Sequence, residues 1–244
     1  MDGTRVALVT GGSRGIGAAT ALRLAEDGMD VALTYVGDGA AAAEVAAGIE
    51  ALGRRALVVR ADAGDAEQAA ACVTQTVDRF GRIDVLVNNA GVGVLGPLEE
   101  LGTAEVDRVL AVNVRGAFLT ARAAAGPMGA GGRIISVGSC VTQRVPGPGC
   151  TLYTMSKSAL IGLTKALARE LGGRGITANV VHPGPVDTDM NPAGGPFAGP
   201  QAAMTALGRF AAAREVAAVV SFLAGDDAVY VTGAEFAVDG GHAA

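Results

Sequence analysis

Short apolar segments alternate with amphipathic segments along almost the whole chain, and this alternation constrains the fold more than any other feature. The apolar segments are rich in Val, Ile and Leu, and they cover Val6–Thr10, Val31–Tyr35, Ala56–Arg60, Ile83–Val87, Arg133–Val137, Ile176–Val181 and Glu235–Val238. Continuous apolar strands of this length are typical of a parallel sheet that is buried on both faces.

The segments between the strands have helical spacing. We expect helices over Ala18–Gly28, Ala41–Gly53, Glu67–Phe80, Thr103–Arg115 and Tyr153–Leu171. In the last of these, apolar residues recur every three or four positions. Seven strands separated by helices predict an α/β fold, a doubly wound Rossmann-type domain with a parallel seven-stranded sheet. No Ser/Pro-rich linker divides the chain, so we expect one domain over residues 1–244.

Composition excludes several classes of protein. The net charge is −5 and the arginines are scattered, which does not suit a nucleic-acid-binding surface. No apolar run reaches the ~18 residues that span a bilayer, and the strand at Val6 leaves no room for a signal peptide. Three cysteines and two histidines without ligand spacing predict no metal site and reduced thiols. We therefore expect a cytoplasmic protein without a membrane contact.

A glycine-rich turn at residues 10–17, with the sequence TGGSRGIG, follows the first strand and begins a helix. Gly11, Gly15 and Gly17 allow a sharp turn and bring backbone N–H groups close to a pyrophosphate, which the positive end of the helix also attracts. This predicts a dinucleotide site, with an ordinary turn as the alternative. A nucleoside-triphosphate loop is excluded because the Gly-Lys-Ser/Thr ending is missing.

Further motifs follow in order along the chain. They are Asn88-Asn89-Ala90-Gly91, Asn113 in VLAVNVRG, Ser139 after the fifth strand, Tyr153-Thr154-Met155-Ser156-Lys157, Pro183-Gly184 with Thr188, and Val238-Asp239-Gly240-Gly241. Together with TGGSRGIG, this set resembles the short-chain dehydrogenase/reductase family over essentially the whole chain, and in particular its 3-oxoacyl-carrier-protein reductase-like branch. The family fold agrees with the one that the strand pattern predicts.

The resemblance and the turn together imply a nicotinamide cofactor site. Its expected members are Gly11, Ser13, Arg14, Gly15, Ile16, Gly17, Tyr35, Asp62, Asn89, Gly91, Tyr153, Lys157, Pro183, Gly184, Val186 and Thr188. By resemblance, Asp62 binds the adenine amino group, Asn89 lies beside the adenosine ribose, and Thr188 and the Val186 backbone hold the carboxamide. Read without the family, Asp62 could cap the helix that starts near Asp65, and Asn89 could brace a strand end.

The second strand indicates which cofactor is used. NAD-binding sites of this fold usually place a carboxylate about 20 residues after the glycines, to bind the ribose 2′-hydroxyl. Tyr35 stands there instead, and Arg14 supplies a positive charge for a 2′-phosphate. We therefore expect NADP(H) rather than NAD(H), although Asp38 offers a carboxylate in the following loop.

Tyr153 and Lys157 are four positions apart on one helix and share a face. A free phenol has a pKa near ~10, and a lysine cation ~4 Å away at an effective dielectric of ~20 lowers it by about three units. The family implies that Tyr153 donates a proton, Ser139 positions the reacting oxygen, Lys157 binds the nicotinamide ribose, and the Asn113 backbone carbonyl holds a water.

Ser139 and Tyr153 are fourteen positions apart, one more than is common in the family. We attribute the extra residue to the loop Cys140–Thr151, whose Pro and Gly residues can absorb it. Ser136 is expected within the strand, which makes it a poor substitute for Ser139, and Cys140 is expected as a wall of the site.

These residues predict an NADPH-dependent carbonyl reductase acting on a ketone, either a 3-oxoacyl thioester or a polyketide-like or aromatic ketone. The alternatives are an NAD(H)-dependent alcohol dehydrogenase of the same fold and a non-catalytic NADP-binding regulatory module. Asn191–Pro200 contains three Pro and three Gly, which predicts irregular structure and a substrate lid at about 190–205. The expected pocket walls are Val92, Val94, Leu95, Arg144, Val145, Cys150, Met190 and Phe197.

Two partners are considered. Docking of an acyl carrier protein is weakly supported, because Arg174 is the one basic residue that fits and the chain is itself acidic. A homotetramer is expected from the small residues on the helix Tyr153–Leu171, namely Ala159, Gly162, Ala166 and Ala168, and by resemblance from Glu235–Gly241. The alternative is that these small residues pack within one subunit.

Overall fold

The computed structural model describes residues 3–244, and Met1 and Asp2 lie outside the described residues. Its main element is a seven-stranded parallel sheet in the order β3-β2-β1-β4-β5-β6-β9. The strands are β1 (Val6–Val9), β2 (Asp30–Tyr35), β3 (Ala56–Arg60), β4 (Val85–Asn88), β5 (Arg133–Val137), β6 (Thr177–Pro183) and β9 (Glu235–Val238). The predicted α/β fold and the parallel seven-stranded sheet are confirmed.

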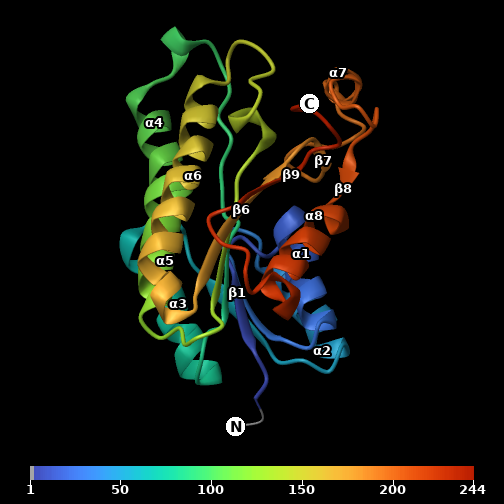
Figure 1. Ribbon diagram of the computed structural model, residues 1–244. Coiled ribbons are helices and arrows are strands. Elements are labelled where there is room, and N and C mark those ends of the chain that lie inside the picture. The colour runs from blue at the N-terminus through green and yellow to red at the C-terminus, as the bar shows by residue number, and fades with distance from the viewer. Residues whose placement is uncertain (1–2) are drawn as a thin grey trace.

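Helices cover both faces of the sheet (Figure 1). One face carries α1 (Gly15–Glu26), α2 (Gly39–Ala51) and α8 (Ala213–Ala224), and the other carries α3 (Ala66–Phe80), α4 (Thr103–Leu110), α5 (Ala117–Ala125) and α6 (Thr151–Leu171). Successive side chains of a strand point to opposite faces of the sheet. In β1, Ala7 and Val9 therefore lie in one apolar core, and Val6 and Leu8 lie in the other. The inner strands β1, β4, β5 and β6 are mostly apolar because both of their faces are buried.

The strand order reverses between β1 and β4. β1 pairs with β2 on one side and with β4 on the other, so the loops after β1 and β4 turn to opposite faces of the sheet. A crevice therefore opens at the carboxyl ends of these strands, where open α/β sheets bind ligands. Smaller elements gather near that edge: η1 (Leu98–Glu100), η3 (Cys140–Thr142), the short pair β7 (Val186–Asp187) and β8 (Ala211–Ala212), and α7 (Ala198–Ala203).

Several predicted boundaries are wrong. The fourth strand begins at Val85, and the sixth runs from Thr177 to Pro183. The helix expected to end at Arg115 instead continues through a π-helical turn, η2 (Ala111–Gly116), into α5. Gly116 does not end this helix: a Cβ there would lie 2.2 Å from the Ala63 carbonyl oxygen, so the glycine allows a close backbone approach.

The segment Asn191–Pro200 is not wholly irregular. α7 begins at Ala198, and Pro200 is its third residue. Proline is tolerated in the first helical turn because the N–H groups there have no partner within the helix. The helix α8 was not predicted at all. Two short 3-10 turns, η4 (Gly172–Arg174) and η5 (Asp226–Ala228), complete the structure, and no helix within residues 3–244 is long and apolar enough to cross a membrane.

Candidate active site

The glycine turn joins β1 to α1 and has the backbone that its sequence predicts. Gly11 and Gly15 have φ angles of +63° and +54°, which L side chains rarely adopt. At Gly17, a Cβ would lie 2.2 Å from the carbonyl oxygen of Gly11. Arg14 is the N-cap of α1 and makes no side-chain capping bond, so the first amides of the helix remain available to an anion. Ser13 lies in the turn, and Ile16 packs against the core.

The turn is fixed to the end of β4 by Thr10 and Asn89. The Asn89 side-chain amide donates to the carbonyl oxygens of Thr10 and Gly11, both at 2.9 Å. The Thr10 hydroxyl accepts from the backbone N–H groups of Asn89 and Ala90, both at 3.0 Å. The structure therefore gives Asn89 the bracing role that the sequence left as an alternative to its place beside the ribose.

The end of β2 carries the residues that bear on cofactor choice. Tyr35 ends the strand, next to Arg60 on β3. The Asp38 carboxylate accepts from the Ala41 backbone N–H at 2.9 Å and caps α2, so this acidic group is committed to the helix. Val36, Arg60, Asp62 and Gln68 line a cavity of about 380 Å³ beside it. The sequence analysis did not include Arg60 among the cofactor-binding residues. A basic residue at the end of β3, the strand next to β2, was the signal that could have identified it.

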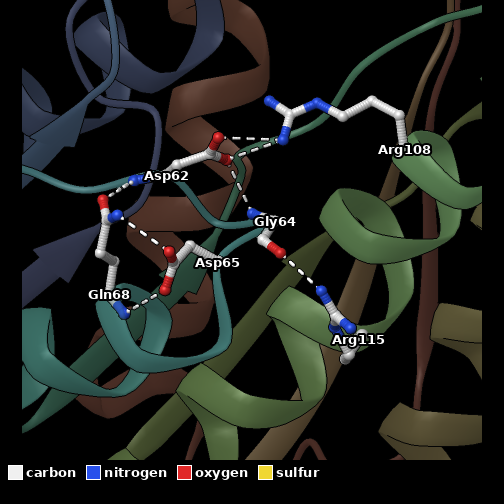
Figure 2. A network of polar contacts seen from close by, with 6 residues as sticks. All are labelled: Asp62, Gly64, Asp65, Gln68, Arg108 and Arg115. Carbon is white, nitrogen blue, oxygen red and sulfur yellow. Dashed lines mark hydrogen bonds and ion pairs between the residues drawn. The ribbon is translucent and has the colours of Figure 1, made fainter.

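Asp62 belongs to a polar network that Figure 2 shows. Its carboxylate pairs with Arg108 of α4, with Nη1–oxygen distances of 2.9 and 3.1 Å, and accepts from the Gly64 N–H at 2.8 Å. Gln68 accepts from the Asp62 backbone N–H at 2.9 Å. Asp62 therefore does not cap α3. That role belongs to Asp65, which accepts from two backbone N–H groups of the first turn and whose pKa these bonds lower.

The four expected catalytic residues come from three different elements. Ser139 follows β5 and is the N-cap of η3, Tyr153 and Lys157 lie on one face of α6, and Asn113 lies in the π-helical turn. The Ser139 and Tyr153 side chains interact, and this interaction lowers the pKa of the phenol. Lys157 donates to the Val137 carbonyl oxygen at 2.9 Å, and its Nζ lies 6.0 Å from the centre of the Tyr153 ring.

Gly91 and Asn113 complete the wall beside this pair. A Cβ on Gly91 would lie 3.2 Å from Lys157 Nζ and 3.4 Å from Asn113 Oδ1. The Asn113 side chain is fixed by both backbone groups of Val92, each at 2.9 Å, and donates to Ser156 Oγ at 3.0 Å. A single π-helical turn inside an α-helix is frequent at functional sites. The water held by the Asn113 carbonyl stays a prediction.

The loop after β6 lies against the glycine turn. The nearest atom to a Cβ on Gly15 would be Thr188 Cγ2, at 3.1 Å, and a Cβ on Gly184 would lie 2.6 Å from the Asp239 Cα. Val186 is buried in β7, and Pro183 ends β6. The loop after β6 therefore meets the glycine turn through Thr188. Two motifs that are distant in the sequence thus lie side by side, as expected for one site that contains Pro183, Gly184, Val186 and Thr188.

Burial acts on both ionisable groups of the α6 pair. It raises the pKa of Tyr153 above its usual value, while the hydrogen bond with Ser139 lowers that pKa. Burial also lowers the pKa of Lys157 from 10.5 to about 8. The predicted lowering of the tyrosine pKa by the lysine is therefore wrong for the protein by itself, because burial of the phenol raises that pKa and the ammonium donates to Val137.

The spacing of fourteen positions between Ser139 and Tyr153 is accommodated by the loop between them, which begins with the 3-10 turn η3 directly after Ser139. Ser136 is buried within β5, as expected, and Cys140 is a buried wall. Exposed apolar side chains occur in the segments that follow β4, β5 and β7, namely Leu95, Val145, Met190, Phe197 and Leu207. Arg144 donates to the His242 carbonyl oxygen at 3.0 Å, so this arginine supports the C-terminal segment.

Comparison with known proteins places this geometry in a family. The profile described as "Enoyl-(Acyl carrier protein) reductase" matches residues 11–243. The chain belongs to the short-chain dehydrogenase/reductase family and is an oxidoreductase. It is 42% identical to the Cyclic-di-GMP-binding biofilm dispersal mediator protein of Escherichia coli (strain K12), over 97% of this chain and 96% of that one.

Two further relatives of this short-chain dehydrogenase/reductase are informative. The 3-oxoacyl-[acyl-carrier-protein] reductase of Synechocystis sp. is 42% identical, over 97% of this chain and 96% of that one. The structure of a short chain dehydrogenase from Burkholderia cenocepacia J2315 in complex with NADP matches with a TM-score of 0.97 and 50% identity, over 99% of this chain and 98% of that one. The predicted family and branch are confirmed.

The buried cation at Lys157 should lower the stability of the fold. Folding lowers the pKa of Lys157 from 10.5 to about 8. Below pH 8 the lysine is therefore protonated in both the folded and the unfolded state, and the full cost of burying the charge is present. The free energy of unfolding rises as the pH increases from about 8 to 10.5, because only the folded state then loses the proton. We expect Lys157→Met to raise the free energy of unfolding at pH 7 by about 1–3 kcal/mol, with a smaller gain at pH 9.5. Urea unfolding at both pH values measures this.

Lys165 provides the matched control, because its side chain is 57% exposed. Lys165→Met should change the unfolding free energy by about 0.5 kcal/mol or less. Destabilisation by Lys157→Met at pH 7 would show that the bond to Val137 outweighs the burial of charge.

Proposed function

We propose that the protein is an NADPH-dependent carbonyl reductase that reduces a ketone to an alcohol. The observation that carries the proposal is the meeting of the Tyr153 phenol, the Ser139 hydroxyl and the Lys157 ammonium beside the glycine turn. A proton donor, an oxygen-binding hydroxyl and a buried cation next to a dinucleotide turn are the groups that carbonyl reduction needs.

The glycine turn fits a dinucleotide. Its close backbone approaches leave no room for a Cβ at Gly17, and the uncapped start of α1 offers N–H groups to a pyrophosphate. Arg14 and Arg60 would bind the 2′-phosphate that distinguishes NADP(H), and Asp38 is committed to capping α2. The Burkholderia cenocepacia relative was solved in complex with NADP, which supports the same choice.

When bound, NADPH supplies a hydride to the carbonyl carbon. Tyr153 donates a proton to the carbonyl oxygen, and Ser139 hydrogen-bonds the same oxygen and orients it. Lys157 binds the ribose hydroxyls, and its charge stabilises the phenolate that remains after proton transfer. Asn113 holds a water through its backbone carbonyl, which would return a proton to the tyrosine.

The substrate side is apolar. Leu95, Val145, Met190, Phe197 and Leu207 have exposed apolar side chains on the segments that would border the substrate, which suits a 3-oxoacyl thioester or a polyketide-like or aromatic ketone. The segment at about 190–205 would close over it as a lid. A relative named as a 3-oxoacyl-[acyl-carrier-protein] reductase supports the thioester, whereas the scarcity of basic residues gives an acyl carrier protein little to bind.

A regulatory role is the alternative, because another relative is named as a cyclic-di-GMP-binding protein. The retention of Ser139, Tyr153 and Lys157 close together favours catalysis, since Ser139 interacts with Tyr153 and Lys157 Nζ lies 6.0 Å from the centre of the Tyr153 ring. Monitoring NADPH oxidation at 340 nm against ketones and acyl thioesters, with calorimetric titration of cyclic-di-GMP in parallel, separates the two functions. Turnover with NADH alone would favour the NAD(H)-dependent alcohol dehydrogenase.

We also propose that the protein is a homotetramer, with α6 at one two-fold interface. A groove of about 680 Å³ runs along α6 and the α4–α5 region, and its lining is mostly apolar: Leu110, Val114, Phe118, Ala159, Leu160 and Leu163, with Asp107, Ala111 and Arg115. The same helix from a second copy, turned by a two-fold axis, would fill this groove.

Tyr153→Phe should remove nearly all turnover while NADPH binding is kept, because the phenol gives the proton and the glycine turn holds the cofactor. We expect a fall in kcat of about 10²–10⁴-fold. Steady-state kinetics and NADPH fluorescence titration measure the two effects. Retention of more than about a tenth of the rate would contradict the general-acid role.

Arg14→Ala should weaken the binding of NADPH more than that of NADH, because only NADPH carries the 2′-phosphate. The loss of one charge-assisted contact predicts a rise of about ten- to a hundredfold in the Kd for NADPH and little change for NADH. The wild-type ratio of kcat/KM values decides the preference itself. A higher value with NADH would overturn the assignment.

Gly162→Glu should dissociate the oligomer without unfolding the subunit, since nothing lies within 4 Å of a Cβ at this position. Light scattering after size exclusion should show a tetramer for the wild type and smaller species for the variant. Gly129→Glu is the control, because it too has open space within the subunit but lies off α6. A 24 kDa wild-type species at micromolar concentration would refute assembly.

A further inference from the structure

A buried histidine that the proposed mechanism does not use lies directly behind the serine loop. His182 is on β6, next to the carboxyl end of β5, and it is fully buried. Its ring fills the space that a side chain at position 138 would occupy: a Cβ on Gly138 would lie 2.5 Å from His182 Nδ1. The conformation of the segment that leads into Ser139 therefore depends on this ring.

The backbone of Ser139 is held on both sides. Its N–H donates to His182 Nδ1 at 3.3 Å, and its carbonyl oxygen accepts from the Thr142 hydroxyl at 2.9 Å. Thr142 Oγ1 also lies 3.2 Å from His182 Nδ1. The ring, the threonine and the serine thus form one compact cluster at the start of η3.

These partners assign the tautomer of the ring. Nδ1 faces the Ser139 N–H, which can only donate, so Nδ1 must carry the lone pair. The proton of the neutral ring is then on Nε2. This atom has no hydrogen bond of good geometry within residues 3–244, and the acceptor that faces it is Glu235 Oε2, at 3.3 Å. If Nδ1 carried the proton, it would face the Ser139 N–H as a second donor, and Nε2 would face Glu235 Oε2 as a second acceptor.

Glu235 connects the ring to the surface of α6. Its other oxygen lies 2.8 Å from Lys165 Nζ, and the Lys165 side chain is mostly exposed. Lys165 is on the helix that carries Tyr153 and Lys157. The chain of contacts Lys165–Glu235–His182–Ser139 therefore links β9 and α6 to the backbone of the serine whose side chain interacts with Tyr153.

We propose that His182 is a positioning residue for Ser139: its neutral ring accepts the serine N–H through Nδ1, and Glu235, paired with Lys165, keeps the ring proton on Nε2. This inference rests on the proposed function, because it gives Ser139 the task of orienting a carbonyl oxygen. Small displacements of such a group are costly, since ~1 Å of misplacement can reduce a rate by about 10²-fold.

Two substitutions at position 182 separate positioning from simple packing. Asn places its amide oxygen near the position of Nδ1, whereas Gln extends to the position of Nε2 and leaves Nδ1 without a replacement. We expect His182→Asn to keep at least about ten times the kcat of His182→Gln, with NADPH affinity alike in both. The assay is reduction of the N-acetylcysteamine thioester of acetoacetate by NADPH, or of an aromatic ketone where that is the better substrate.

The matched control is the other histidine, His242, which is also buried. His242→Asn and His242→Gln should have kcat values similar to each other. Thermal unfolding of all four variants detects any loss of fold. Equal kcat values for folded His182→Asn and His182→Gln would overturn the inference, because packing alone would then account for the ring.

The pH dependence gives a second readout. The active form of the ring is neutral, and burial lowers its pKa below the usual 6.5, so reduction should fail on the acid side only below that value. Glu235 from β9 raises this pKa, Lys157 from α6 lowers it, and Lys165 offsets the charge of Glu235. Thr142 and the Ser139 backbone, which also face the ring, carry no charge.

Glu235→Gln should therefore move the acid limb of kcat to lower pH by about one unit, and Lys165→Gln should move it to higher pH. Both residues are partly exposed, so these variants test the inference even where position 182 tolerates no change. An acid limb that neither substitution moves would overturn it. Full activity of Tyr153→Phe, by contrast, would overturn the proposed function itself.

Discussion

The tie between Thr10 and Asn89 is the interaction on which the rest of the site depends. β1 and β4 are paired neighbours at the point where the sheet order reverses, so the loops that follow them turn to opposite faces of the sheet. Four hydrogen bonds of 2.9–3.0 Å between the two loops hold the glycine turn against the end of β4. They satisfy buried backbone groups that the sheet leaves unpaired, so the crevice is formed before any ligand enters.

Polar groups are also buried at the end of β5 and beside the loop after β4, and each has a specific backbone partner. Lys157 donates to the last residue of β5, and Asn113 is bound at both ends by Val92. The lowered pKa of Lys157 shows that this arrangement works against the charge it holds. A fold that keeps a buried cation there gives up stability for a site whose groups are already in position.

The part of the crevice beside the end of β2 contains carboxylates that are already bound to other groups of the protein. Asp38 caps α2, Asp65 caps α3, and Asp62 is paired with Arg108. The charge of Asp62 is thus balanced by Arg108, while Asp38 and Asp65 are held at helix starts. Arg60, from the end of the adjacent strand, lines the cavity there. The selection of a phosphorylated cofactor would thus depend on several residues distributed over β2, β3 and α4.

The sequence by itself determined the class of fold and the position of each motif. Continuous apolar strands require cover on both faces, and glycines at 11, 15 and 17 permit one backbone that no other residue adopts without strain. The period of four between Tyr153 and Lys157 placed both on one helix face, because helix geometry is local. These features depend on near neighbours in the chain, and so they could be predicted without a structure.

Only the tertiary structure decided how the charges and buried polar groups are paired. The partners of Asp62, Lys157 and His182 lie 46, 20 and 43 positions away, on elements that the fold brings together. The sequence predicted a helix that ends at Arg115, and only the approach of Ala63 shows why a glycine stands at position 116, where the helix continues. Burial, which fixes the pKa of each group, depends on all the atoms packed around it, and no local pattern in the sequence records that environment.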